Sequence, residues 1–296
     1  MMRFATDRPR FRSAPAWRRR GLLAVGLFAG LFALATIGAV RPAAAQGKLD
    51  AHYEASLAGI PVGKGAWTIE IADDQYNAAA SGGTSGLLKA FAGGSGTGAA
   101  TGRIVAGALV PSNYTATTTA SKKSETIRMA LQGGGVKEFS IEPEPPADPE
   151  RIPVTEAHRR GVIDPMTGSL LRVAGSGDVL SADACRTSTS IFDGRMRYDL
   201  KLDYKRMDTV KAEKGYHGPV VVCAVYFSPL AGYIPDRAAI KYLAAQRNIE
   251  VWLAPIAGTR VLVPFRMTVP TPLGTAMLEA VDFVTTAVPP RLAKTQ

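Results

Sequence analysis

Alternation of apolar and polar side chains at a period of two is the feature that most restricts how this chain can fold. A period of two places one face of an extended strand on a core and the other face in water. Turns rich in glycine and proline separate the alternating segments, and the 30 glycines of the chain suit strands that bend sharply. We therefore predict several short antiparallel strands, arranged as a barrel or a sandwich. The alternating segments of the first half are residues 53–57, 66–71, 115–119 and 126–131.

The second half of the chain repeats this pattern and adds two candidate helices. Asp164 is placed to cap a short helix that starts at Pro165 and runs to about Val173. A second helix is predicted from Asp236, its N-cap, to Gln246, because its apolar positions fall on one face. The candidate strands here are residues 191–192, 198–204, 220–227, 249–253, 260–268 and 275–283.

One continuous sheet explains the pattern better than two domains, because neither half has its own complete layer of helices. The predicted fold is therefore mainly β: an antiparallel spiral or barrel-like sheet with one or two short helices, in a single domain over residues 46–288. Within it, residues 142–163 are acidic and rich in proline, which predicts a surface excursion or linker. Residues 289–296 are predicted to form a flexible tail.

The first 45 residues have the three parts of a secretory signal peptide. Seven arginines lie within the first twenty residues, an uncharged apolar run covers residues 21–40, and three alanines at 43–45 offer a cleavage site before Gln46. We expect cleavage near Ala45-Gln46 and a periplasmic mature protein. Retention as a membrane anchor is the alternative, because about 20 apolar residues can span a bilayer. Residues 19–23 partly match the twin-arginine export pattern, but their neighbours depart from it, so general export is favoured.

The positive charge of the chain is concentrated in this N-terminal segment. The whole chain carries a formal net charge of +10, but residues 1–45 hold eight arginines and one aspartate, which leaves +3 for the remainder. This mild balance gives no basis for binding nucleic acid. The chain has two cysteines, Cys185 and Cys223. In an oxidising compartment an even pair predicts one disulfide, and two buried free thiols are the alternative.

Several short motifs occur in an order that is typical of a known family. They are Gly59-Ile60-Pro61-Val62-Gly63, Asp164-Pro165-Met166-Thr167-Gly168, Cys185, residues 191–200, Cys223, residues 249–253 and Pro272-Leu273-Gly274. In these residues the chain resembles the DUF3108 family, an exported bacterial family of unknown function, over most of its mature part. Its layout is similar, more distantly, to alphaproteobacterial periplasmic envelope-integrity proteins, and this second resemblance implies a spiral β-barrel with one disulfide. Neither resemblance supplies catalytic residues.

The sequence contains no motif with a known catalytic mechanism. It has no nucleophile elbow, no phosphate-binding loop and no zinc-ligand spacing, and its three histidines, His52, His158 and His217, are scattered. We therefore predict no catalytic, cofactor-binding or metal-binding residues.

Two groups of residues are candidates for contact with a ligand or a partner. Asp193, Arg195 and Arg197 form the densest polar cluster, and arginine makes planar contacts with phosphate or carboxylate. The alternative is a hairpin turn whose strand carries these groups on its solvated face. Trp67 and Trp252 are candidates to line an apolar cavity, and the alternative is that they are core or rim residues.

Export, the β-rich pattern and the lack of a catalytic motif lead to one hypothesis with two alternatives. We expect a non-enzymatic periplasmic protein that supports cell-envelope integrity, with a lipid or acyl chain bound in a cavity of the barrel. The first alternative is a periplasmic scaffold that binds an envelope protein through its outer surface. The second is a hydrolase with an unrecognised site. The expected partners are a lipid or an envelope protein, without nucleic acid, metal or cofactor.

Overall fold

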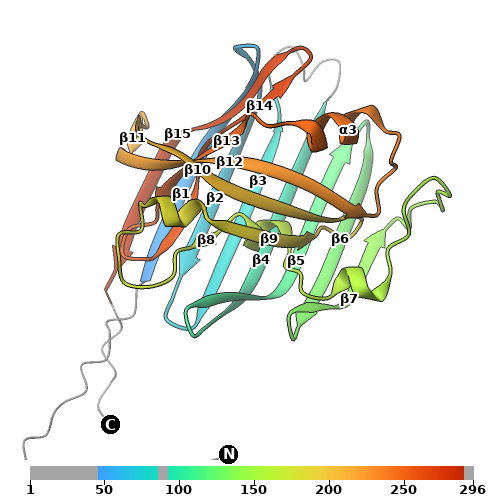
Figure 1. Ribbon diagram of the computed structural model, residues 1–296, viewed down its shortest axis with the longest axis horizontal. Coiled ribbons are helices and arrows are strands. Elements are labelled where there is room, and N and C mark those ends of the chain that lie inside the picture. Colours follow the sequence, from blue (N-terminus) through green and yellow to red (C-terminus); the bar gives the residue numbers. More distant parts are fainter. Residues whose placement is uncertain (1–45, 86–92, 290–296) are drawn as a thin grey trace, which may run out of the picture. The chain divides into compact units, whose positions relative to one another are not determined.

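The computed structural model describes residues 46–85 and 93–289, and within them fifteen strands form one sheet (Figure 1). The ladders are antiparallel, except for a short parallel one between β11 and β15. The first seven strands are β1 (Gln46–Leu57), β2 (Ile60–Ile71), β3 (Gln75–Thr84), β4 (Gly94–Val105), β5 (Ala108–Ala120), β6 (Lys123–Gln132) and β7 (Gly135–Glu142). The others are β8 (Leu171–Arg172), β9 (Thr187–Phe192), β10 (Arg197–Lys211), β11 (Lys214–Gly215), β12 (His217–Ala231), β13 (Ile249–Pro255), β14 (Val261–Thr271) and β15 (Gly274–Val288).

The strand order consists of two meanders joined through the first and last strands. It runs β7-β6-β5-β4-β3-β2-β1-β15-β14-β13-β12-β10-β9, with β11 beside β15 and β8 beside β14. The ladder between β1 and β15 extends from Gln46 opposite Val288 to Leu57 opposite Ala276. All four alternating segments of the first half lie in strands, and the predicted mainly β, antiparallel fold class is confirmed.

The sheet curls so that its two meanders share one core. In Figure 1, β10 and β12 cross in front of strands from the first meander. One hydrophobic cluster contains Ile69 of β2 and Tyr76 of β3 together with Phe265 of β14 and Phe283 of β15. These side chains are essentially without solvent exposure, so each meander supplies the apolar surface that covers the other.

The sheet does not close into a continuous ladder, but a short segment connects its two edges. Arg160 forms an antiparallel bridge with Gly135 of β7, and Ile163 forms a parallel bridge with Ile191 of β9. The amide of Val162 donates to the carbonyl of Gly134 at 3.2 Å, and the amide of Ile163 donates to the carbonyl of Ser190 at 3.0 Å. Backbone groups of both edge strands thus find partners that an open sheet would leave to solvent.

The helices are shorter than the sequence pattern predicts. Asp164 does cap α2, since its carboxylate accepts from the Thr167 amide at 2.8 Å, but α2 covers only Pro165–Gly168. The predicted extension to Val173 is wrong because residues 171–172 pair as β8 with β14. The Val173 amide also donates to the backbone carbonyl of Arg260 at 2.9 Å. A ladder partner from the second meander outcompetes continuation of the helix.

The second helix, α3, covers Ala238–Ala245 and begins after Asp236. The prediction that Asp236 is its N-cap is wrong, because Arg237 occupies that position and the Asp236 carboxylate accepts from Lys241 Nζ at 2.7 Å. No helix within residues 46–85 and 93–289 is long and apolar enough to cross a membrane. The signal peptide predicted for residues 1–45 lies outside the described residues, as does nearly all of the predicted tail.

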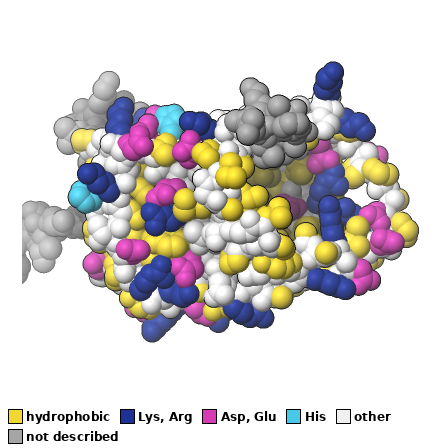
Figure 2. Space-filling view, turned by 90° about the horizontal axis from the view of Figure 1, so that it is seen from above, with side chains coloured by type: hydrophobic (Ala, Val, Ile, Leu, Met, Phe, Trp, Pro, Cys, Tyr) yellow, Lys and Arg dark blue, Asp and Glu magenta, His cyan; other side chains and the backbone are white. Residues whose placement is uncertain are grey.

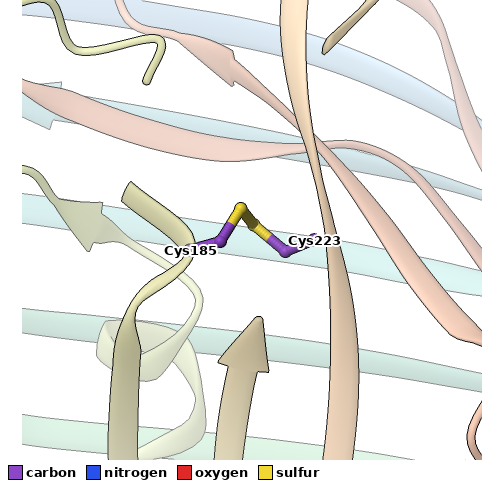
Figure 3. The surroundings of a disulfide bond; sticks show 2 residues. All are labelled: Cys185 and Cys223. Carbon is purple, nitrogen blue, oxygen red and sulfur yellow. A yellow bond between two sulfur atoms is a disulfide. The ribbon is translucent and has the colours of Figure 1, made fainter. Parts of the chain in front are cut away.

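The predicted disulfide between Cys185 and Cys223 is present (Figure 3). It links a 3-10 turn, Ala182–Cys185, to β12, with 5.5 Å between the two Cα atoms. Both cysteines are fully buried, in a second hydrophobic cluster that includes Val221, Val251 and Leu253. The bond therefore fastens the connection between β8 and β9 onto the core of the second meander.

Removal of this disulfide is expected to lower the free energy of unfolding by about 3–4 kcal/mol, because it closes a loop of 38 residues. The measurement is urea unfolding of the protein with and without a reductant. The double variant Cys185→Ala/Cys223→Ala is the control, and it should be as unstable as the reduced protein and insensitive to reductant. Equal stability of the oxidised and reduced proteins would contradict the prediction.

Candidate functional site

An apolar cavity of about 430 Å³ lies between the first three strands and the strands β14 and β15. Its size falls within the range of small-molecule sites in proteins. Trp67 and Tyr53 supply its aromatic wall, and Met267 and Leu278 supply aliphatic surface from the second meander. The full lining is Tyr53, Ala55, Gly63, Lys64, Gly65, Ala66, Trp67, Ala80, Ser81, Gly82, Gly83, Ser169, Pro264, Met267 and Leu278.

Glycines at matching register positions leave this space open. Gly65 of β2 lies directly opposite Gly82 of β3, so neither residue of the pair places a side chain on the sheet. A Cβ atom built on Gly65 would lie 3.0 Å from the carbonyl oxygen of Ser81, tighter than nine in ten real Cβ contacts. Close backbone approach therefore favours glycine here, and the absence of side chains leaves room for the cavity.

The indole of Trp67 has a hydrogen-bond donor without a partner. Its side chain is 8% exposed, and its Nε1 atom is buried with no acceptor among the described residues. The neighbouring Tyr53 is satisfied, because its hydroxyl donates to the carbonyl of Pro264 at 2.7 Å. A buried indole N–H usually finds a partner, so a donor without an acceptor among the described residues distinguishes Trp67 from Trp252.

A second apolar hollow continues from this cavity toward the tips of two hairpins. We call it the apolar groove; its volume is about 640 Å³, and it shares Ala55, Met267 and Leu278 with the cavity of Trp67. The shared walls make the two spaces neighbours along one apolar path. Its other lining residues are Ser56, Leu57, Val62, Val269, Thr271, Pro272, Leu273, Ala276 and Met277.

The polar residues predicted as ligand contacts are engaged in contacts within the fold and do not line the cavity. Asp193 Oδ1 accepts from the amides of Arg195 at 2.8 Å and Met196 at 2.6 Å. The Arg195 guanidinium makes a two-point ion pair with Glu125, which joins the β9–β10 turn to β6. Arg197 donates to Asp199 at 2.6 Å. Ligand contact by these three residues stays a prediction.

The two predicted tryptophans have different environments. Trp67 lines the cavity, whereas Trp252 lies elsewhere in the same core, with its Nε1 donating to Asp208 Oδ2 at 2.8 Å. That hydrogen bond lowers the pKa of Asp208, and the guanidiniums of Arg206 and Arg266 lie 5.3 and 5.2 Å from the Trp252 ring. Trp252 therefore has its polar and aromatic partners in place, and Trp67 does not.

A buried polar cluster that sequence reasoning missed lies next to α2. Tyr76 of β3 is hydrogen-bonded through its hydroxyl to Thr167 Oγ1 at 2.7 Å, and Thr167 Oγ1 donates to Asp164 Oδ2 at 2.6 Å. All three residues are buried. Burial raises the pKa of Asp164 and of Tyr76, and burial together with the charges of Asp164 and Asp193 raises the pKa of Tyr114 to about 12. Only the capping role of Asp164 had a signal in the sequence.

This cluster holds α2 against the sheet and provides few groups for catalysis. Each polar atom of the chain from Tyr76 to Asp164 has a partner inside the fold. Within residues 46–85 and 93–289 there is no group of three or more side chains arranged to hold a metal ion.

The raised pKa of Asp164 predicts a specific pH dependence. The folded state holds the proton of this carboxyl more tightly than the unfolded chain, whose pKa is 3.8. The contribution of Asp164 is therefore full below that value and is lost as the pH rises through the folded-state pKa. Asp164→Asn should remove this loss, so the variant gains stability relative to the parent between about pH 4 and pH 7, measured by urea unfolding.

Two further variants separate charge from capping at this position. Asp164→Ala should cost about 2 kcal/mol of unfolding free energy at the lower pH, because the cap of α2 and the partner of Thr167 are both lost. The cost should be smaller at the higher pH, where the parent has itself lost the contribution of Asp164. Asp236→Asn is the control for carboxylates in general, and it should keep the pH response of Asp164. A response of Asp164→Asn that equals that of the parent would contradict the assignment.

Comparison with known proteins gives a family match and a similar solved structure. The family model described as "Protein of unknown function (DUF3108)" matches residues 52–281. The chain is also similar to a solved β-barrel-like protein of domain of unknown function DUF1849 from Brucella abortus. That protein is 11% identical in sequence, the match covers 83% of this chain and 99% of that one, and the TM-score is 0.42. No curated protein matches the chain.

Proposed function

The chain belongs to the DUF3108 family, whose function is unknown, and we propose that it is a non-enzymatic periplasmic protein that binds an acyl chain of an envelope lipid. The acyl chain occupies the cavity at Trp67 and extends into the apolar groove. By holding such a chain, the protein serves the integrity of the cell envelope. A scaffold that binds an envelope protein is the alternative outcome of the experiments below.

The unpartnered indole N–H of Trp67 is the observation that carries this proposal. Trp67 lines a mainly apolar cavity, and its Nε1 atom is buried without an acceptor among the described residues. An ester or carboxyl oxygen that reaches Nε1 after a small shift of the indole would accept this hydrogen bond. The wall is mainly apolar, with Lys64, Ser81 and Ser169 as its polar residues, which favours a hydrocarbon chain over a polar ligand. The neighbouring groove gives the chain apolar surface beyond the cavity itself.

The export of the protein is supported by two independent features. The N-terminal 45 residues have the charge and hydropathy pattern of a secretory signal. The disulfide between Cys185 and Cys223 is a bond that forms and persists in oxidising compartments such as the periplasm. A non-enzymatic role is supported by the engagement of Asp164, Asp193 and Arg195 in contacts within the fold.

Native mass spectrometry of the purified protein with palmitate tests the proposal directly. One palmitate should bind per protein. Ala55→Leu should weaken binding about tenfold, because the added methyl groups project into the junction between cavity and groove. Ala79→Leu is the matched control: Ala79 is exposed on the opposite face of β3, so binding should be unchanged. A ligand-free spectrum at every palmitate concentration would sink the proposal.

Tryptophan fluorescence locates the bound chain. Beyond residue 45 the sequence has only Trp67 and Trp252, so a Trp252→Phe variant leaves Trp67 as the sole reporter in that part. Its emission should shift when palmitate binds, whereas the emission of Trp252 in a Trp67→Phe variant should stay constant. Trp67→Phe should also weaken palmitate binding about fivefold, which is the effect of one hydrogen bond. A shift reported by Trp252 alone would place the ligand elsewhere.

A further inference from the structure

Two hairpin tips with exposed apolar side chains lie side by side at one end of the sheet. The Ala58 amide in the β1–β2 turn donates to the carbonyl of Thr275, just after the β14–β15 turn, at 2.9 Å. Ile60 on the first hairpin is 64% exposed, and Leu273 on the second is 75% exposed. These are the most exposed large hydrophobic side chains of the described residues, and they lie on adjacent hairpins although far apart in sequence.

The apolar groove opens at these tips. Leu273 belongs to its lining, and so do Leu57 and Val62 on the first hairpin. An apolar path therefore runs from the cavity at Trp67, past the shared residue Ala55, to the most exposed leucine of the described residues. Figure 2 views this end of the sheet and shows hydrophobic side chains gathered in the middle of the face.

The same end of the sheet carries exposed basic side chains on the β5–β6 hairpin and before α3 (Figure 1). Lys122 lies in the β5–β6 turn, Lys123 begins β6, and Arg237 precedes α3. All three are exposed, and none has an ion pair among the described residues. The acids on the neighbouring turns and helix are neutralised, because Glu54, Glu125 and Asp236 are paired with Lys64, Arg195 and Lys241. Further acids, Glu144 and Glu150, lie on the excursion that follows β7.

We propose that this end of the sheet docks on an anionic lipid surface, with Ile60 and Leu273 inserted among the acyl chains and the lysines of the β5–β6 turn near the headgroups. This inference rests on the proposed function, since the acyl chain held at Trp67 would enter from that surface. An apolar tip pair beside an apolar groove lets the chain pass from lipid to cavity without crossing water. Basic groups near the surface add attraction to anionic headgroups.

Vesicle flotation tests the docking surface. The full protein should float with vesicles of phosphatidylcholine and phosphatidylglycerol, and more weakly with phosphatidylcholine alone. The variant Ile60→Asp/Leu273→Asp should lose at least about tenfold in vesicle affinity for each tip. Lys122→Gln and Lys123→Gln should each weaken binding about fivefold on the anionic vesicles only, with a smaller effect at high salt.

Val105→Asp is the matched control. Val105 is 51% exposed on the β4–β5 hairpin, which lies at the other end of the sheet, so this variant adds one negative charge, as each tip substitution does, without touching the proposed surface. It should float like the parent. Equal losses of vesicle affinity for Val105→Asp and for the tip variant would overturn the proposal. A parent protein that remains at the bottom of the gradient would overturn it too. A dimer in sedimentation velocity that the tip variant abolishes would assign this face to a second copy and likewise overturn it.

The two proposals fail separately. Palmitate binding is measured by native mass spectrometry without vesicles. Ile60 lies outside the lining of both the cavity and the apolar groove, so the single variant Ile60→Asp should lose about tenfold in vesicle affinity and still bind palmitate. A parent that floats on vesicles but never binds palmitate would keep the docking surface and remove the acyl-chain function. A parent that binds palmitate but does not float would remove the docking surface alone.

Discussion

The ladder between β1 and β15 is the interaction on which the rest of the fold depends. Every other long ladder joins strands that are neighbours along the chain or nearly so, whereas this one joins Gln46 to Val288. Without it the two meanders would be separate curved sheets, each with an apolar face in water. With it, Ile69 and Tyr76 share one core with Phe265 and Phe283. The entropy of closing so long a loop is offset by the burial of both faces together.

Much of this architecture could be predicted from the sequence, and the missing part has a physical reason. Alternation at a period of two is a property of each strand alone, so it indicated the β fold and most of the strands. The disulfide followed from an even cysteine count, and the cap at Asp164 followed from its position before a proline. The end of α2 could not be predicted, because it depends on a ladder between β8 and β14 that brings distant residues together.

The candidate site shows the same division. Trp67 and Trp252 look equivalent in sequence, since each is an aromatic residue in an alternating strand. Their difference arises from neighbours contributed by other strands: Asp208 satisfies the indole of Trp252, whereas nothing among the described residues satisfies that of Trp67. Likewise, the polar run from Asp193 to Arg197 suggested ligand contact, but Glu125, seventy residues away, is the partner of Arg195. Such pairings are set by register between strands and not by local composition.

The pairing of β1 with β15 also has a consequence for how the chain can be rearranged. Gln46 lies opposite Val288, so the start of β1 and the end of β15 lie beside each other at one end of their ladder. A short peptide could join them, and the chain could instead be opened at the Gly133–Gly134 turn between β6 and β7. Every ladder would survive this circular permutation, because the order of strands in space would not change. The strand order in space therefore does not depend on where the chain begins and ends.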